Sequence, residues 1–163
     1  MNRIDFFVDG FNLYHSLASN PSYYKYKWLN LDRLARCFIT SHDKVEKVFY
    51  FTTYATRDQA KLVKHQIYVK ALQFIGVEVV FGAFRYVDKT CRVCHKQYKT
   101  FEEKQTDVNI AIKLFQTAVQ DLWDTAVIVS GDSYLIPAIE AVKNTFPTKR
   151  IGLVIQIEGA QKS

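Results

Sequence analysis

The sequence has no long apolar run and none of the glycine-rich motifs that bind nucleotides. No apolar run approaches the roughly 18 residues that a transmembrane helix needs, and residues 1–7 read as a strand without the apolar core of a signal peptide. No GxGxxG follows the first strand, no Walker P-loop is present, and Ser130 has no GxSxG elbow around it. We therefore expect a cytoplasmic protein with no transmembrane segment. A Rossmann oxidoreductase is disfavoured.

Cysteine is scarce and odd in number, which argues against a disulfide framework. Only Cys37, Cys91 and Cys94 are present, and the last two form a CxxC pair. In a cytosolic chain this spacing indicates metal or redox chemistry more than a structural disulfide. A structural zinc ion needs four ligands, so this pair would be half a site. The missing ligands could come from His95, His65 or Cys37, or from the same pair of a second subunit in a homodimer. The alternative is that Cys91 and Cys94 are free thiols that bind no metal.

The bulk composition is that of one folded, basic unit. With 163 residues, 48% of them hydrophobic and 23% charged, the chain is long enough for one sizeable core, so we expect a single domain over residues 1–163. Lys and Arg outnumber Asp and Glu by 22 to 16, which gives a formal charge of +6. This excess favours a polyanionic partner such as nucleic acid, and a merely solvated basic surface is the alternative.

Strand-like and helix-like segments alternate along the chain. The predicted strands are residues 3–8, 45–54, 77–86, 126–129 and 150–155. The predicted helices are residues 12–19, 31–39, 58–75, 106–120 and 133–143. The tyrosine-rich stretch 19–26 is predicted as a loop, and the polar, Cys-bearing stretch of about 87–102 as an inserted hairpin. In the helix at 106–120 the apolar face is expected to comprise Val108, Ala111, Ile112, Phe115 and Val119.

This alternation predicts a three-layer α/β/α fold with a mostly parallel central sheet and the small hairpin as an insertion. In such sheets, ligands bind beyond the carboxyl ends of the strands. Asp9 and Asp132 follow two predicted strands, and Asp107 opens the helix before the second of them. Close carboxylates repel each other unless a hard cation lies between them, so the three predict a Mg²⁺ or Mn²⁺ site acting on a phosphodiester. Each carboxylate also has a structural explanation by itself. Asp9 could open a turn, Asp107 could interact with the positive end of its helix dipole, and Asp132 could cap the next helix.

Five further polar residues are candidates to support these carboxylates. Glu103 offers another carboxylate, and Lys104 a contact to phosphate, although a solvated charge run is the commoner explanation of such residues. Asn12, Ser130 and Ser133 can orient water or phosphate, or can cap helices instead.

Cations and aromatic rings are interleaved through the predicted insertion. Arg92, Lys96, Tyr98 and Lys99 lie within it, and Arg85 lies just before it. Cations neutralise phosphates and rings stack on bases, so this pattern predicts binding of single-stranded RNA. A solvated surface is the alternative.

Three segments together resemble the NYN domain family, and in particular its bacterial LabA-like branch. They are residues 7–13 (FVDGFNL), 102–108 (EEKQTDV) and 129–133 (VSGDS), and the resemblance extends over about residues 3–155. It implies a PIN-like fold and ribonuclease activity with one or two Mg²⁺ or Mn²⁺ ions. By the same resemblance Asp9, Asp107 and Asp132 are the metal ligands and Asn12 supports them. This branch often carries a CxxC at the same place, which favours zinc.

Two departures from the family pattern leave the activity open. Tyr134 stands where a further Asp is usual, which removes a hard anionic ligand. Three functions therefore stay open. They are a metal-dependent ribonuclease, a catalytically weak RNA-binding or regulatory module, and a phosphatase or small-nucleotide hydrolase. After Ile155 a further helix is expected, but residues 156–163 are short and polar, so the tail is either truncated or divergent.

Overall fold

The core of the protein is a five-stranded, all-parallel sheet. This computed structural model describes residues 1–54 and 58–155, apart from the side chains of Phe101, Glu103 and Lys104. The strand order is β3-β2-β1-β6-β7. The bounds are β1 (Asn2–Asp9), β2 (Asp43–Thr52), β3 (Glu78–Phe81), β6 (Thr125–Val129) and β7 (Arg150–Val154). The expected tail after Ile155 lies outside the described residues.

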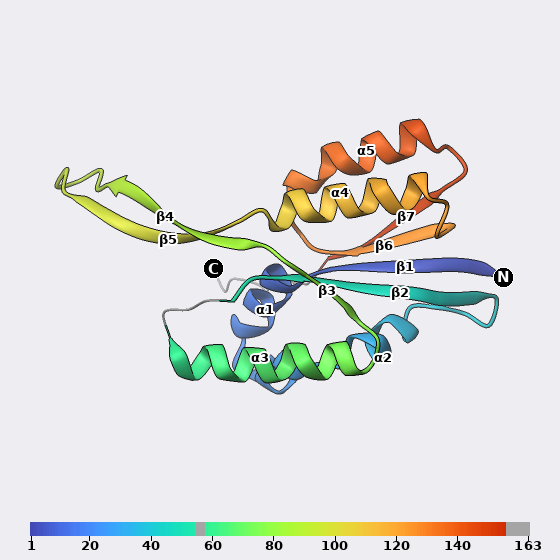
Figure 1. The fold of residues 1–163 in the computed structure, drawn as a ribbon, viewed down its shortest axis with the longest axis horizontal. Coiled ribbons are helices and arrows are strands. Elements are labelled where there is room, and N and C mark those ends of the chain that lie inside the picture. The colour runs from blue at the N-terminus through green and yellow to red at the C-terminus, as the bar shows by residue number, and fades with distance from the viewer. Residues whose placement is uncertain (55–57, 156–163) are drawn as a thin grey trace.

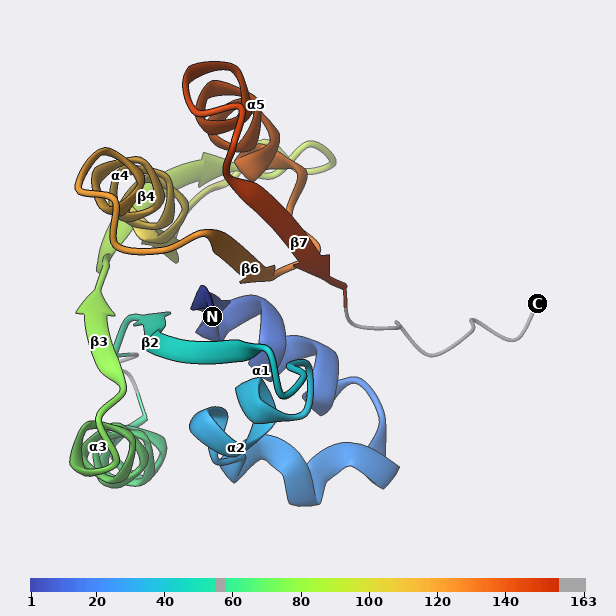
Figure 2. The same cartoon turned by 90° about the vertical axis from the view of Figure 1, so that its right-hand side faces the viewer.

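Helices cover both faces of this sheet, as Figures 1 and 2 show. Helices α4 and α5 lie on one face, and α1, α2 and α3 lie on the other. Their bounds are α1 (Gly10–Ala18), α2 (Leu31–Arg36), α3 (Gln59–Phe74), α4 (Thr106–Val119) and α5 (Ile136–Thr145), with 3-10 turns η1 (Pro21–Trp28) and η2 (Ser133–Leu135). The predicted three-layer α/β fold with a mostly parallel sheet is confirmed. No helix in the described part of the chain is both long and apolar enough to cross a membrane.

The alternation of β1 produces two cores, one on each side of the sheet. Phe6 and Val8 point into the cluster formed with α1, α2 and α3, whereas Phe7 points toward α4 and α5. Phe7 stacks there against Phe49 of β2, with ring centroids 5.1 Å apart. Because both faces are covered, the strand is buried along most of its length, as expected for a parallel sheet. Asp5 and Asp9 lie on the same side of β1 as Phe7.

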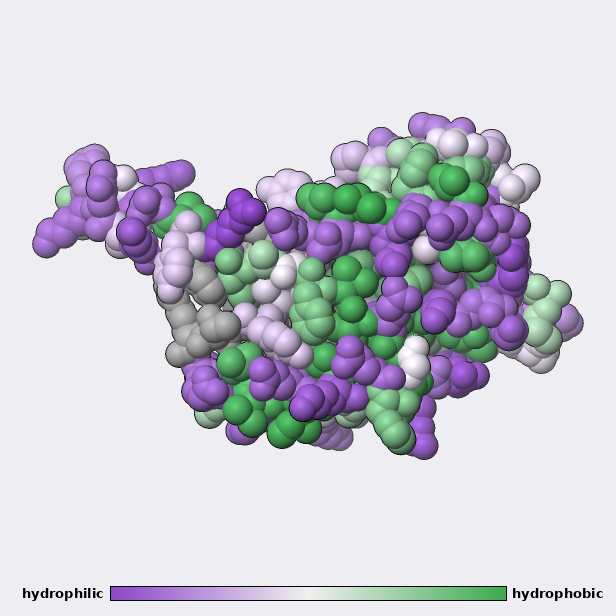
Figure 3. Space-filling model, in the orientation of Figure 1, coloured by the Kyte–Doolittle hydropathy of each residue, from purple (hydrophilic) through white to green (hydrophobic). Residues whose placement is uncertain are grey.

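The apolar face of α4 that the sequence indicates is not the face that packs on the sheet. Ile110 and Leu114 are fully buried against the sheet, whereas Ile112 is 59% exposed, and Val108 and Val119 are exposed as well. The helix is apolar on both sides, so periodicity alone could not say which side meets the sheet. Figure 3 shows the hydrophobic surface that results over α4.

The predicted strand at 77–86 is two strands in the structure. β3 ends at Phe81, and the Gly82 amide donates a 2.8 Å hydrogen bond to the Thr52 carbonyl oxygen. β4 (Ala83–Thr90) then pairs antiparallel with β5 (Gln97–Lys104) in a separate two-stranded sheet. The hairpin thus begins about four residues before the predicted insertion, and Figure 1 shows it projecting beyond the carboxyl edge of the main sheet.

The predicted loop at 19–26 is also wrong in part, because residues 21–28 form the 3-10 turn η1. The Asn20 side chain accepts a 2.9 Å hydrogen bond from the Ser22 amide, and Pro21 occupies the first position. Both features are ordinary helix-start signals. None of the residues of η1 is buried, so its aromatic side chains lie at the surface.

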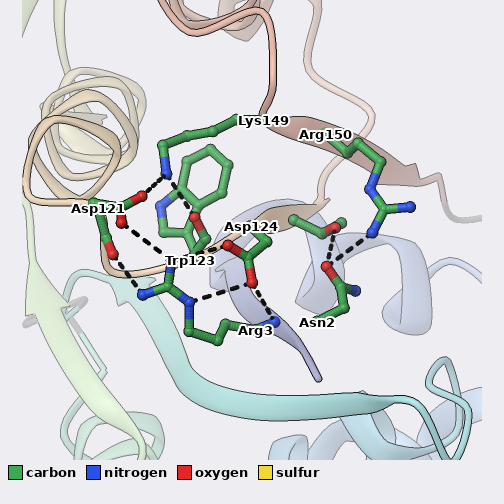
Figure 4. Close-up of polar contacts among 8 residues, drawn as sticks. Asn2, Arg3, Asp121, Trp123, Asp124, Lys149 and Arg150 are labelled. Atoms are coloured by element: carbon green, nitrogen blue, oxygen red, sulfur yellow. Dashed lines mark hydrogen bonds and ion pairs between the residues drawn. The ribbon is translucent and has the colours of Figure 1, made fainter.

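The amino edge of the sheet is closed by an ionic network (Figure 4). The Arg3 guanidinium contacts Asp124 at 2.8 Å and Asp121 at 3.3 Å. Lys149 donates to Asp121 and to the Trp123 carbonyl oxygen, both at 2.7 Å. These ion pairs tie β1, β6 and β7 together at the amino edge. Because ligands of parallel sheets bind beyond the carboxyl ends of the strands, a ligand site is expected at the opposite edge.

Candidate functional site

Asp9 is the best-anchored polar residue at the carboxyl edge of the sheet. It ends β1 and caps α1, with Oδ1 accepting hydrogen bonds from the amides of Phe11 (3.1 Å) and Asn12 (3.0 Å). Oδ2 accepts a 2.9 Å hydrogen bond from the Ser130 hydroxyl. The residue is buried. The three donors fix the carboxylate in one orientation.

The segment after β6 is tied to this carboxylate by further hydrogen bonds. The Ser130 hydroxyl accepts from the Asp132 amide at 3.1 Å, and Asp132 Oδ1 accepts from the Tyr134 amide at 2.9 Å. Asn12 Oδ1 accepts from the Gly131 amide at 3.1 Å. Since β1 and β6 are parallel neighbours, their exits meet at the same edge. Asp9, Asn12, Ser130 and Asp132 therefore form one connected group, which we call the carboxyl-edge cluster.

The surroundings of Asp9 act on its pKa in opposite directions. Burial raises the pKa of Asp9, and the negative charge of Asp132 raises it further. The hydrogen bonds from the Asn12 amide and the Ser130 hydroxyl act in the opposite direction. A cation between two such groups would relieve their repulsion.

The donor set suits a hard divalent cation only in part. Mg²⁺ is commonly held by one or two carboxylates, with water and phosphate oxygens completing its shell, and Asp9 and Asp132 provide such a pair. Among the side chains that the structure describes, which leave out Glu103, no three of His, Cys, Asp or Glu come close enough to hold a metal ion together. Asp107 lies half-buried in the first turn of α4. The ligand set of three carboxylates therefore stays a prediction.

The other predicted support residues are less informative. Ser133 opens η2 and is exposed, and Tyr134 is 79% exposed. Tyr134 contributes its backbone amide to Asp132, while its phenol faces solvent and supplies no anionic ligand. The side chains of Glu103 and Lys104 lie outside the described part of the chain.

Gly10 follows Asp9 for a steric reason that the sequence did not reveal. The Asp-Gly pair suggested a turn, but Gly10 is the first residue of α1. A Cβ atom there would lie 2.5 Å from the Tyr50 ring and 2.7 Å from the Phe51 carbonyl oxygen. Glycine thus lets α1 start directly against β2, which sets the position of Asp9 and Asn12.

The predicted RNA-binding cations lie on the β4–β5 hairpin and its tip. Arg85, Arg92, Lys96 and Lys99 are all exposed. Figure 3 shows the hairpin as a mostly hydrophilic arm. It extends from the same edge of the sheet as the carboxyl-edge cluster, so these cations add positive charge on that side.

Cys91 and Cys94 lie at the tip of this hairpin. The His95 amide donates to the Cys91 carbonyl oxygen at 2.9 Å, and the Cys91 amide donates to the Lys96 carbonyl oxygen at 2.9 Å, which closes a tight turn. Hydrogen bonds from the amides of Cys94 and Val93 lower the pKa of the Cys91 thiol. This favours the thiolate, which is the form that binds zinc.

The additional zinc ligands considered from the sequence do not join this pair. Cys37 caps α2, with its sulfur 3.3 Å from the Arg33 carbonyl oxygen, and His65 Nε2 lies 3.1 Å from the Thr52 hydroxyl. His95 follows the pair directly, yet no third His, Cys, Asp or Glu completes a metal group among the described residues. Zinc binding by the CxxC pair therefore stays a prediction.

Comparison with known proteins decides the family. The sequence model of the NYN domain matches residues 3–158. The chain belongs to the NYN domain family. NYN domains have nuclease-type, RNA-related functions, and nucleases of this PIN-like kind typically use divalent metals. The LabA-like branch stays a prediction.

Two individual proteins are similar to this NYN domain. The 6-hydroxy-3-succinoylpyridine 3-monooxygenase HspA of Pseudomonas putida is 25% identical over 197 residues, covering 99% of this chain and 62% of the relative. The chain thus spans less than two thirds of that relative's length. A solved structure of a protein of unknown function, VPA0982 from Vibrio parahaemolyticus, superposes with a TM-score of 0.59 at 18% identity, covering 94% and 81% of the two chains. This likeness supports the fold alone.

Proposed function

We propose that this NYN domain is a Mg²⁺- or Mn²⁺-dependent ribonuclease that hydrolyses phosphodiester bonds of single-stranded RNA at the carboxyl-edge cluster. The observation that carries the proposal is the hydrogen-bonded link from the Asp132 amide through the Ser130 hydroxyl to the Asp9 carboxylate, which ties two acidic residues to each other where the parallel strands end. Two carboxylates at this edge match the needs of a cation that also binds phosphate.

Each residue of the cluster has a distinct role in this proposal. Asp9 and Asp132 hold the ion, and Asp107 joins them as the third ligand expected from the family pattern. The ion, when bound, polarises the phosphodiester and lowers the pKa of a bound water. Ser130 keeps Asp9 and Asp132 in register. Asn12 uses its carbonyl oxygen on Gly131, which leaves its amide nitrogen as a donor for a phosphate oxygen.

The charge around the cluster also favours a polyanion. Helices α1 and α4 both begin at this edge, so the positive ends of their dipoles lie on the side where phosphate would bind. The exposed cations of the β4–β5 hairpin extend from the same side. Both features would attract RNA and retain it while it is cut.

A catalytically weak RNA-binding module is the second candidate, and Tyr134 is the observation that favours it. This residue supplies no carboxylate, so the site has fewer anionic ligands than the family pattern provides. RNA binding without cleavage in the presence of Mn²⁺ would support the module. Cleavage of the polymer would support the nuclease, and hydrolysis of mononucleotides in preference to the polymer would indicate a phosphatase. The activity in the name of HspA is a property of that protein, and we do not transfer it to this chain.

We also propose that Cys91 and Cys94 bind a structural Zn²⁺ together with the same pair of a second copy of this chain. Four thiolates complete the tetrahedral shell that one chain cannot provide. The purified protein should then contain one zinc per two chains and sediment as a dimer that EDTA dissociates. Cys91→Ser should remove both zinc and dimer, while Cys37→Ser should retain them. A zinc-free monomer with two titratable thiols at the hairpin would contradict the proposal.

A further inference from the structure

Aromatic rings lead away from the carboxyl-edge cluster along α1. Phe11 follows Asp9 by two positions, and its ring centroid lies 6.1 Å from that of Phe84 on β4. On its other side, the Phe11 ring lies 4.6 Å from that of His15. The ring of Tyr14 lies in turn 5.7 Å from that of His15. A row of rings thus begins at the cluster and continues along the outer surface of α1.

A lysine joins this row to the rings of η1. Lys27 Nζ lies 5.4 Å from the centroid of the Tyr14 ring and 3.8 Å from that of the Tyr24 ring. Lys25 Nζ lies 5.0 Å from the centroid of the Tyr26 ring. These are cation–π distances, so each cation is held against a ring face. Phe11, His15, Tyr14, Lys27 and Tyr24 form one continuous series, which we call the aromatic track.

The track lies at the surface and not in the core. The rings of Phe11, Tyr14 and Tyr24 are between 37% and 48% exposed, and Trp28 at the end of η1 is 54% exposed. Large rings are usually mostly buried, so several exposed rings in succession indicate a binding surface. Figure 2 shows the segment between α1 and α2, which contains η1, on the side of the molecule away from the sheet.

The charge of the track identifies its partner. The sequence from Gly10 to Leu31 contains two lysines and no aspartate or glutamate. The next acidic residue, Asp32, is paired with Arg36 at 2.8 Å. Exposed rings next to lysines, in a segment whose sequence has no acidic residue, match single-stranded nucleic acid, whose bases stack on rings while its phosphates contact lysines.

We propose that the aromatic track binds the part of a single-stranded RNA that extends beyond the carboxyl-edge cluster. The proposal rests on the proposed function, because the track begins at Phe11 beside Asp9. It assigns a substrate-binding role to a segment separate from the β4–β5 hairpin. RNA held on α1 and η1 would present one of its phosphodiesters to the cluster.

The test is the affinity of the full chain for a fluorescein-labelled 12-nucleotide oligouridine, measured by fluorescence anisotropy without added Mg²⁺ or Mn²⁺, because the proposed cleavage needs one of these ions. Tyr14→Ala and Tyr24→Ala should each weaken binding by roughly tenfold, because each removes a stacking partner. Tyr24→Phe should bind as the wild type does. Phe74→Ala removes an exposed ring at the far end of α3 and should have no effect.

The cation is tested separately by the salt dependence of binding. Lys27→Gln should reduce the slope of log affinity against log salt concentration by about 0.7, the value for one phosphate contact on a single strand. Lys143→Gln, an exposed lysine in α5, should leave the slope unchanged. A merely structural role of Lys27 would lower thermal stability without changing this slope.

The outcomes separate the track from the proposed function. If the wild type binds RNA and the Tyr14, Tyr24 and Lys27 variants bind equally well, the proposed RNA-binding role of the track is wrong. The nuclease proposal is then unaffected. If the wild type neither binds nor cuts RNA, both proposals fail. If the wild type binds phosphatidylserine vesicles and not RNA, and the same variants lose this binding, the surface is a membrane contact. This result would contradict the proposal that the track binds RNA.

Discussion

The hydroxyl of Ser130 donates a 2.9 Å hydrogen bond to Oδ2 of Asp9, a residue 121 positions earlier in the chain. Ser130 follows β6, and Asp9 ends the neighbouring strand β1, so one side chain links the two strand exits. The same hydroxyl accepts the Asp132 amide. Ser130 therefore ties the Asp9 carboxylate to the backbone of Asp132.

Ser130→Ala should weaken both stability and metal binding. A hydrogen bond to a charged group contributes about 1.5–3 kcal/mol, and its loss leaves a buried carboxylate oxygen less well satisfied. We expect the free energy of unfolding, measured in urea, to fall by an amount in this range. Mn²⁺ affinity, measured by calorimetry, should fall as well. Ser133→Ala, at an exposed position three residues later, should change neither, and equal behaviour of the two variants would contradict the role of Ser130.

The two faces of α4 should respond very differently to truncation. Ile110 is fully buried against the sheet, whereas Ile112 is 59% exposed. Ile110→Ala should lower the free energy of unfolding by about 2–5 kcal/mol, because it leaves a cavity in the core. Ile112→Ala should cost about 0.5 kcal/mol or less. Chemical denaturation of both variants checks the assignment, and a larger loss for Ile112→Ala than for Ile110→Ala would contradict it.

The stability of the protein should fall as pH rises, because of Asp5. This residue is fully buried, and neither carboxyl oxygen makes a well-formed hydrogen bond within the described part of the chain. Burial raises its pKa from 3.8 to about 7. The folded state therefore binds a proton that the unfolded state releases between these two pH values. The stability from that proton is fully present below about pH 4 and is lost as the pH rises through about 7.

Asp5→Asn isolates this effect, because the amide has almost the same shape and does not ionise. The difference in unfolding free energy between the variant and the wild type should move in favour of the variant from pH 4 to 7, with a slope of up to about 1.4 kcal/mol per pH unit. Above pH 7 the difference should level off. Asp43 and Asp124 have pKa values lowered to about 2, so their titration lies below this window. A difference that is constant with pH would contradict the assignment.

Much of the fold followed from the sequence, because strands such as β1 and β6 are short apolar runs ending at Asp or Ser-Gly-Asp. The positions of Asp9 and Asp132 at one edge followed from the parallel topology. The burial of α4 did not, since Val108 and Ile112 fit the helical period as well as Ile110 and Leu114. Periodicity reports that a face is apolar, but only packing decides which apolar face meets the sheet.

Local chemistry was also harder to predict than topology. The steric need for Gly10 arises from Tyr50 and Phe51 on another strand, which no local pattern reveals. The link from Ser130 to Asp9 likewise depends on the register of two strands that are far apart in the sequence. The aromatic track has a signal in the tyrosines and lysines of residues 21–28, but a polar, tyrosine-rich stretch around a proline also predicts a loop. The capping pair Asn20 and Pro21 could have indicated the helical turn.

The most direct test of the account is cleavage of labelled single-stranded RNA by the full chain with Mn²⁺, Mg²⁺ or EDTA, comparing the wild type with Asp132→Asn. The substitution retains the shape of the side chain and removes one anionic ligand. We predict metal-dependent cutting by the wild type, none in EDTA, and a loss of about 100-fold or more in the variant, the scale on which a single electrostatic catalytic group contributes. No cutting by a folded, metal-loaded wild type, or equal cutting by the variant, would contradict the proposed site.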